Sequence, residues 1–240
     1  MKDKPIIAGL QKLTLLDYPD KMAAILFLPG CNMACPFCHN SELIHGQQSE
    51  IDYDDVMAFL KKRKNMLDGV VITGGEPTLQ DITSLLQDIK NLGYSIKVDT
   101  NGSHPEAIHK WLSSNLVNYI AMDIKNSPLY YARTCGTSKI KPETIDKSIV
   151  YLKHSNIPHE FRTTVTPSLH DVKDIETIAK WIGKEENFFI QPFVKRDTVP
   201  DQSLIEPSDQ FLLDCLRAAK PHVFHAEIRG RDLPSDTLTN

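Results

Sequence analysis

The chain has 240 residues, of which 41% are hydrophobic and 24% are charged, proportions that are typical of a globular protein with a sizeable core. They exclude the disordered and fibrous classes. An α/β barrel commonly reaches this length as one unit, so we expect a single domain. The 27 basic and 31 acidic side chains give a net charge of −4, which offers no basic surface to a phosphate backbone, so we expect no nucleic-acid partner.

The N-terminal residues lack the apolar segment of a secretory signal, and no window reaches the roughly 18 consecutive apolar residues of a membrane helix. We therefore expect a cytoplasmic protein with no membrane partner. Residues 1–21 are predicted to form an extension packed on the main domain, residues 22–230 the domain itself, and residues 231–240 a flexible tail.

Buried strands and amphipathic helices alternate along the chain. Short apolar runs predict strands, and apolar residues spaced by three and four predict helices. The strands are expected at 22–28, 69–73, 94–99, 118–125, 160–166, 188–193 and 223–228. The helices are expected at 52–66, 82–92, 105–113, 142–155, 171–183 and 207–220, with Asp52 as an N-cap and Gly93 as a C-cap. Strict alternation predicts an α/β fold with a parallel sheet and right-handed crossovers, either doubly wound or an incomplete barrel.

Polar and glycine-rich segments directly follow the first four predicted strands. These segments are 31–40, 74–76, 99–102 and 123–125. The carboxyl ends of parallel strands meet at one edge of the sheet, where the active sites of α/β proteins lie. We therefore expect the four segments to form one site.

Three of the five cysteines, Cys31, Cys35 and Cys38, lie within eight positions, and such a cluster indicates metal or redox chemistry. A structural zinc site needs four protein ligands, and His39 is badly placed to be the fourth because it directly follows Cys38. Covalent haem attachment through C-x-x-C-H, or a thioredoxin-like C-x-x-C, would leave Cys31 without a role. A [4Fe-4S] cluster uses all three thiolates and keeps one iron open for another ligand. Cys135 and Cys215 stand apart and are expected to be ordinary core or surface residues.

The spacing C-x3-C-x2-C, with Phe37 before the last cysteine, resembles the motif of the radical S-adenosylmethionine enzymes. The resemblance implies an incomplete (β/α)6-type barrel with short terminal extensions. It also implies a cluster whose open iron is chelated by the amino and carboxylate groups of S-adenosylmethionine. In that family an electron from the reduced cluster cleaves the cofactor into methionine and a 5′-deoxyadenosyl radical, which abstracts a hydrogen atom.

Two further segments resemble this family. Gly74-Gly75-Glu76-Pro77 is similar to its G-G-E-P motif, which implies that the glycines let the backbone approach the methionine moiety and that Glu76 accepts a hydrogen bond from the ammonium. Arg162 resembles a basic residue that reaches the cofactor carboxylate or ribose. Taken without the cysteines, G-G-E-P would equally be a simple turn.

A monovalent cation is also implied by the resemblance. Asp99, Thr100 and Asp123 match the positions that hold such a cation near the cofactor carboxylate in related activases, and Lys125 is placed to share the charge. Without the cysteines, both aspartates would equally be solvated strand ends. The predicted cofactor-binding residues are Phe37, His39, Asn40, Gly74, Gly75, Glu76, Asp99, Asn101, Asp123, Lys125 and Arg162.

The resemblance covers most of the chain and is strongest to glycyl-radical-enzyme activases, in particular those of anaerobic ribonucleoside-triphosphate reductase. Residues 12–19, 31–40, 73–77 and 99–102 carry it. Val194 stands where activases of pyruvate formate-lyase commonly have a histidine, which argues against that assignment. The implied partners are a glycyl-radical enzyme, here the anaerobic ribonucleotide reductase, and a flavodoxin or ferredoxin as electron donor.

Other functions stay open at this point. The chain could activate pyruvate formate-lyase or another glycyl-radical enzyme. It could also be a 7-carboxy-7-deazaguanine synthase that acts on a pterin, although the stretches 16–19 and 38–40 argue against this. A non-enzymatic iron-sulfur electron carrier would not cleave S-adenosylmethionine, and that difference would distinguish it.

Overall fold

A computed structural model describes residues 4–45 and 50–233 of the chain. These residues form one eight-stranded sheet in which spatial order follows sequence order. The strands are β1 (Gly9–Thr14), β2 (Ala23–Leu28), β3 (Gly69–Gly74), β4 (Ser95–Thr100), β5 (Tyr119–Asp123), β6 (His159–Val165), β7 (Asn187–Pro192) and β8 (His225–Ile228). Strand β1 is antiparallel to β2, and β2 to β8 are all parallel. The predicted parallel sheet is therefore confirmed.

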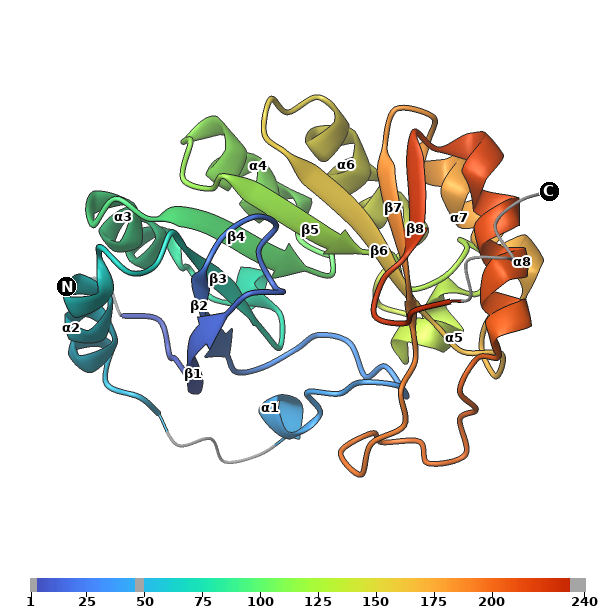
Figure 1. The fold of residues 1–240 in the computed structure, drawn as a ribbon, viewed down its shortest axis with the longest axis horizontal. Helices are drawn as coiled ribbons and strands as arrows, with labels where there is room; N and C mark the ends of the chain where they lie inside the picture. The colour runs from blue at the N-terminus through green and yellow to red at the C-terminus, as the bar shows by residue number, and fades with distance from the viewer. Residues whose placement is uncertain (1–3, 46–49, 234–240) are drawn as a thin grey trace.

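The longer helices lie along the outer face of the curved sheet (Figure 1). The helices are α1 (Glu42–His45), α2 (Tyr53–Arg63), α3 (Thr83–Asn91), α4 (Pro105–Ser113), α5 (Tyr131–Cys135), α6 (Pro142–Lys153), α7 (Val172–Ile182) and α8 (Asp209–Ala219), with short 3-10 turns η1 (Pro77–Leu79) and η2 (Lys220–His222). The main core fills the layer between helices and sheet, where Ile72, Ile96 and Val98 are fully buried. A smaller apolar cluster of Tyr18, Ala23, Ile25 and Val71 lies apart from that core.

Three short elements were not predicted. The sequence of strand β1 shows no alternation of buried apolar and exposed polar residues, and its central residues are exposed. The strand forms by pairing with the edge of β2. Helices α1 and α5 are too short to show a helical period. Within the described residues no pairing joins β1 to β8, so the sheet is an incomplete barrel, as expected. Residues 234–240 of the predicted flexible tail lie outside the described part of the chain.

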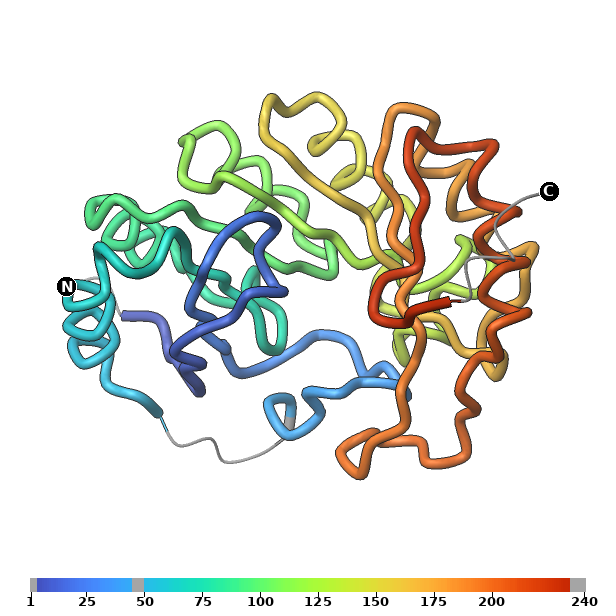
Figure 2. Tube along the Cα trace, viewed as in Figure 1, coloured from blue at the N-terminus to red at the C-terminus, as the bar shows by residue number. Residues whose placement is uncertain are grey.

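The cysteine segment between β2 and α1 runs past the carboxyl ends of the strands toward α5 and the loop after β7 (Figure 2). The Asp201 amide donates to the Pro36 carbonyl at 3.0 Å, and the Ala34 amide donates to the Cys135 carbonyl at 2.9 Å. The segment is thus held from two distant parts of the sequence.

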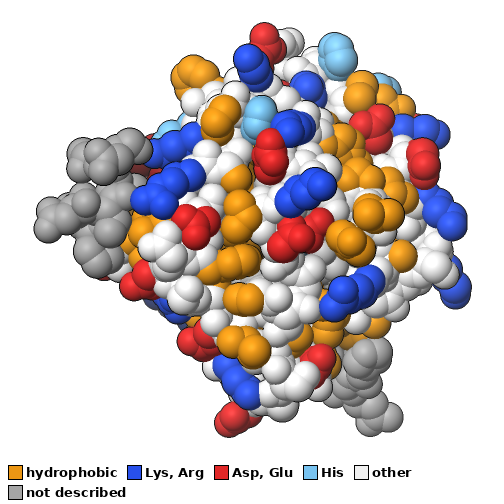
Figure 3. Space-filling view, turned by 90° about the vertical axis from the view of Figure 1, so that its right-hand side faces the viewer, with side chains coloured by type: hydrophobic (Ala, Val, Ile, Leu, Met, Phe, Trp, Pro, Cys, Tyr) orange, Lys and Arg blue, Asp and Glu red, His pale blue; other side chains and the backbone are white. Residues whose placement is uncertain are grey.

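The surface on the α7 and α8 side shows basic and acidic side chains next to one another, without a continuous basic area on that face (Figure 3). This mixture agrees with the small net charge of −4. Among the described helices, none combines the length and the apolar character needed to cross a membrane.

Gly136 offers a test of how tightly α5 holds the cysteine segment. It ends α5 with a φ of +70°, and a Cβ there would lie 2.2 Å from the Ala34 carbonyl oxygen. Gly230 has a similar φ of +96° but nothing within 4 Å of its Cβ position. We expect Gly230→Ala to lower the free energy of unfolding by about 1–2 kcal/mol, the cost of the left-handed backbone alone. Gly136→Ala should lose a further ~1–3 kcal/mol from the steric clash.

Urea unfolding followed by circular dichroism would measure both losses. Equal losses in the two variants would contradict the tight contact between α5 and Ala34.

Candidate active site

A cavity of about 420 Å³ is lined by residues of β1 to β7 and of the cysteine segment. The cavity brings together all the site residues predicted from the sequence, namely Cys31, Cys35, Phe37, Cys38, His39, Asn40, Gly74, Gly75, Glu76, Asp99, Thr100, Asn101, Asp123, Lys125 and Arg162. Nine further residues line the cavity that were not predicted from the sequence, namely Gln11, Asp17, Ile25, Phe27, Met33, Ile44, Thr73, Thr164 and Gln191. Thr164 could have been found, because it lies two residues after Arg162 on one strand and so shares its face.

The three cysteine thiols are partly or fully buried in this cavity. Burial raises the pKa of each thiol, for Cys35 to about 12. Hydrogen-bond donors nevertheless approach the Cys31 sulfur. The Met33 backbone nitrogen lies 3.4 Å from Sγ, and the Asn101 side-chain nitrogen Nδ2 lies 3.9 Å from it. Burial disfavours the thiolate form, and a bound metal cluster would stabilise it.

The donor set fits an iron-sulfur cluster better than a single ion. A structural zinc site needs four protein ligands, whereas an iron-sulfur cube with one open iron uses the three cysteines that line the cavity.

Glycine is required at position 75 by contact between two protein segments. The Gly75 amide donates to the Leu28 carbonyl at 2.8 Å, and the Glu76 amide donates to the Gly30 carbonyl at 2.7 Å. A Cβ on Gly75 would lie 1.8 Å from that Gly30 oxygen. This contact is a reason for glycine that the sequence analysis, which considered only approach to the cofactor, did not foresee.

Glu76 joins the ends of β3 and β4. Its Oε1 accepts hydrogen bonds from the Thr78 amide at 3.1 Å, the Thr78 hydroxyl at 2.6 Å and the Thr100 hydroxyl at 2.7 Å. Its Oε2 accepts from the Asn101 amide at 2.7 Å. Burial raises the pKa of Glu76, and these donors oppose the rise by stabilising the carboxylate. Oε2 accepts one hydrogen bond, from Asn101, where a carboxylate oxygen can accept two, so it keeps acceptor capacity.

Residues His39 and Asn40 fix the end of the cysteine segment. The His39 ring stacks on Phe193, with centroids 5.8 Å apart, and its Nε2 donates to the Val194 carbonyl at 2.7 Å. The side-chain amide of Asn40 donates to the Gly74 carbonyl at 3.3 Å. Both side chains line the cavity while they connect the segment to β3 and to the loop after β7.

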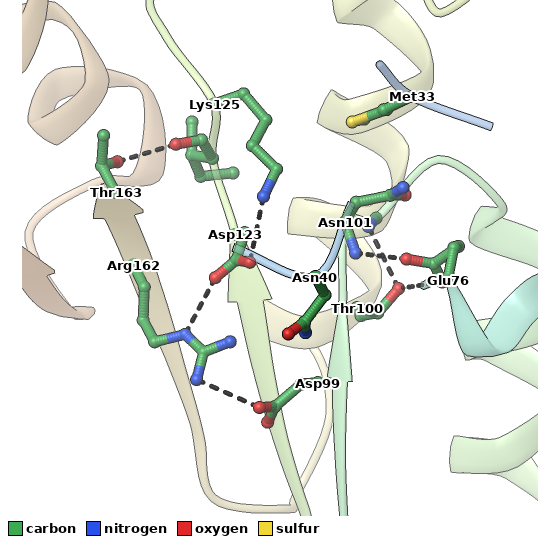
Figure 4. A network of polar contacts seen from close by, with 12 residues as sticks. Met33, Asn40, Glu76, Asp99, Thr100, Asn101, Asp123, Lys125, Arg162 and Thr163 are labelled. Carbon is green, nitrogen blue, oxygen red and sulfur yellow. Dashed lines mark hydrogen bonds and ion pairs between the residues drawn. The ribbon is translucent and has the colours of Figure 1, made fainter. Parts of the chain in front are cut away.

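Charged side chains of three neighbouring strands form one network (Figure 4). Arg162 donates to Asp123 Oδ1 at 2.9 Å and to Asp99 Oδ2 at 3.3 Å. Lys125 donates to Asp123 Oδ2 at 3.1 Å, and Lys97 donates to Asp99 Oδ1. Burial would raise the pKa of Asp123, but attraction by Arg162 and Lys125 outweighs it and lowers the pKa to about 2. Lys97 was not predicted as a site residue, although its position two residues before Asp99 places both side chains on one face of β4.

Replacing Glu76 with glutamine tests its role as a clamp. An amide group cannot accept from all four donors and would set its own N–H against one of them. We therefore expect Glu76→Gln to lower the free energy of unfolding at pH 7 by about 1–3 kcal/mol. Glu176→Gln is the matched control, since Glu176 makes an exposed pair with Lys180 and should change stability by less than about 0.5 kcal/mol. Denaturant titration would measure both, and a Gln variant as stable as the wild type would refute the clamp.

Residues 25–182 match the family model described as the Radical SAM superfamily. Over 239 residues the chain is 34% identical to a protein of Methanocaldococcus jannaschii that is named, provisionally, a glycyl-radical enzyme activating enzyme, with 94% of this chain and 96% of that protein covered. A second protein of the same organism and provisional name is 28% identical over 184 residues, covering 74% of this chain and 69% of the other.

Solved structures share the fold. SuiB of Streptococcus suis, bound to S-adenosylmethionine, superposes with a TM-score of 0.64 at 16% identity, covering 86% of this chain and 52% of SuiB, so the chain spans about half of SuiB. QueE from Escherichia coli gives a TM-score of 0.58 at 15% identity and covers 95% of both chains. The family match and the 34% identity show that this chain belongs to the radical SAM superfamily, and as a member it is an enzyme that uses a [4Fe-4S] cluster and S-adenosylmethionine.

Proposed function

We propose that this chain is the activating enzyme of a glycyl-radical enzyme. The observation that carries the proposal is its 34% identity, over nearly its whole length, to a relative with that provisional name. The gathering of Cys31, Cys35 and Cys38 with the polar strand ends in one cavity supports it further.

The cavity residues divide into groups with distinct tasks. Cys31, Cys35 and Cys38 would hold three irons of the cluster and leave the fourth for S-adenosylmethionine. When bound, the reduced cluster and S-adenosylmethionine supply a radical that removes a hydrogen atom from a glycine Cα of the partner. Lys125 and Arg162 offer positive charge to the cofactor carboxylate, as Glu76 Oε2 offers an acceptor to its ammonium. These assignments are proposals that rest on the donor and acceptor chemistry of each side chain.

A glycine in a protein segment is a chemically favourable target, because its Cα radical is delocalised between the flanking amide nitrogen and carbonyl. The cavity extends to Gln11 and Asp17 in the N-terminal part of the chain. The described strands leave β1 and β8 unpaired with each other. An open side of this kind supports a proposal that an extended segment of a partner protein enters the site.

We propose the anaerobic ribonucleoside-triphosphate reductase as the partner. Residues 12–19 and 38–40 resemble the activases of this reductase, and Val194 replaces the histidine common in activases of pyruvate formate-lyase. A flavodoxin or ferredoxin would supply the electron.

Incubation of the cluster-loaded chain with reductant, S-adenosylmethionine and the reductase of the same cell tests the function. The expected result is the electron-spin doublet of a glycyl radical together with nucleotide reduction. If another glycyl-radical enzyme acquires the doublet instead, the activating function stands and the partner is wrong. Conversion of a pterin without any glycyl radical would refute the activating function.

The cluster assignment predicts which cysteines hold iron. Cys31→Ala, Cys35→Ala and Cys38→Ala should each abolish the cluster, because three thiolates are the fewest that hold the site-open cube of about four irons and four sulfides. Cys135→Ala and Cys215→Ala are matched controls, since both thiols are fully buried but lie outside the cavity lining. Iron and acid-labile sulfide analysis after anaerobic reconstitution would measure this. Zinc uptake without iron would contradict the assignment.

A further inference from the structure

Cationic side chains contact both predicted cation ligands, Asp99 and Asp123. Asp123 bonds Arg162 through Oδ1 and Lys125 through Oδ2. Asp99 bonds Lys97 through Oδ1 and Arg162 through Oδ2. All four carboxylate oxygens therefore face a cationic side chain, so a metal ion bound to any of them would lie next to a like charge.

The third predicted ligand, Thr100, is also engaged. Its hydroxyl donates to Glu76 Oε1 at 2.7 Å and accepts from the Gly102 amide at 3.1 Å. Thr100 thus belongs to the clamp between β3 and β4, and its contacts lie with Glu76 instead of Asp99. The donor set of this chain does not fit the monovalent cation that the resemblance implies.

Charge balance leads to the same conclusion. The network holds three cations, Lys97, Lys125 and Arg162, against the two carboxylates, so it carries one net positive charge. The three cations would repel a metal ion placed beside them, whereas they would attract the carboxylate of a ligand. Lys97 creates the excess, because without it two cations would balance two carboxylates and Asp99 Oδ1 would lose its partner.

The environment of Lys97 makes its ammonium a fixed part of the site. Its side chain is only 2% exposed, and it comes from β4, two residues before Asp99. A buried ammonium is stable only when it is paired, so it stays on the carboxylate instead of turning to solvent.

We propose that Lys97 replaces the monovalent cation, so that this chain binds the carboxylate of S-adenosylmethionine without a metal ion at Asp99 and Asp123. Lys97 is a positioning residue, since it acts through Asp99 and Arg162. The inference rests on the proposed function, because it takes S-adenosylmethionine as the ligand of the cavity.

The test measures the Kd of S-adenosylmethionine for the cluster-loaded protein by anaerobic calorimetry. The buffers have equal ionic strength and contain K⁺, Na⁺ or N-methylglucammonium, whose size excludes it from the site. For the wild type we expect Kd values that agree within about twofold. Lys97→Met frees Asp99 Oδ1, so binding should weaken by about tenfold in N-methylglucammonium and recover in K⁺, which can then occupy the vacated place.

Two further variants keep the test decisive. Lys97→Arg retains the charge and should stay insensitive to the cation. Lys110→Met makes the same chemical change at an exposed lysine, which pairs with Asp81 at 3.4 Å, and should behave as the wild type. If Lys97→Met does not fold, the Kd values of the wild type and of Lys97→Arg in the three buffers still show whether binding depends on the cation.

A wild-type Kd that tightens with K⁺ in a saturable manner would overturn the inference and leave the proposed function intact. Failure of Lys97→Met to regain binding in K⁺ would also overturn it. Absence of binding and cleavage of S-adenosylmethionine by the wild type in every buffer would refute the proposed function, and the inference with it.

Discussion

The pairing of Arg162 with two aspartates is the interaction on which the arrangement of the site depends. The register of β5 and β6 sets Asp123 beside Arg162, and β4 next to β5 brings Asp99 within reach of the same guanidinium. Charged groups taken out of water are stable only when they are paired. A shift of any of these strands by one residue would turn its charged side chain to the opposite face and leave its partner alone. The pairing of opposite charges therefore helps to specify the strand register.

The cysteine segment depends on distant parts of the chain for its shape. Residues 29–41 contain neither helix nor strand, so contacts with other segments must hold them. Helix α5 binds the segment at Ala34, and the loop after β7 binds it at Pro36 and His39. These anchors lie on both sides of Cys35. They hold the thiols in a buried cavity, where burial disfavours the thiolate form and a bound metal cluster would stabilise it.

The incomplete closure of the sheet agrees with the protein substrate that we propose. A closed barrel would surround its cavity with strands, whereas here β1 and β8 form separate edges among the described strands. The cavity reaches from the cysteines to Gln11 and Asp17, near the β1 edge. The residues of β3 to β6 that we propose to bind the cofactor thus line the same cavity as Gln11 and Asp17.

The sequence by itself determined the order of strands and helices and most of the site. Apolar periodicity and the polar segments after the first four predicted strands are local signals, and the parallel sheet necessarily brings those segments to one edge. Tertiary structure alone decided that residues 9–14 join the sheet, because β1 has no apolar pattern of its own and needs the edge of β2. It also decided the partners of Asp99, since a lysine in a strand reveals its charge but not the carboxylate it meets. Pairing between side chains on neighbouring strands depends on register and burial, which are properties of the folded sheet and not of any local segment.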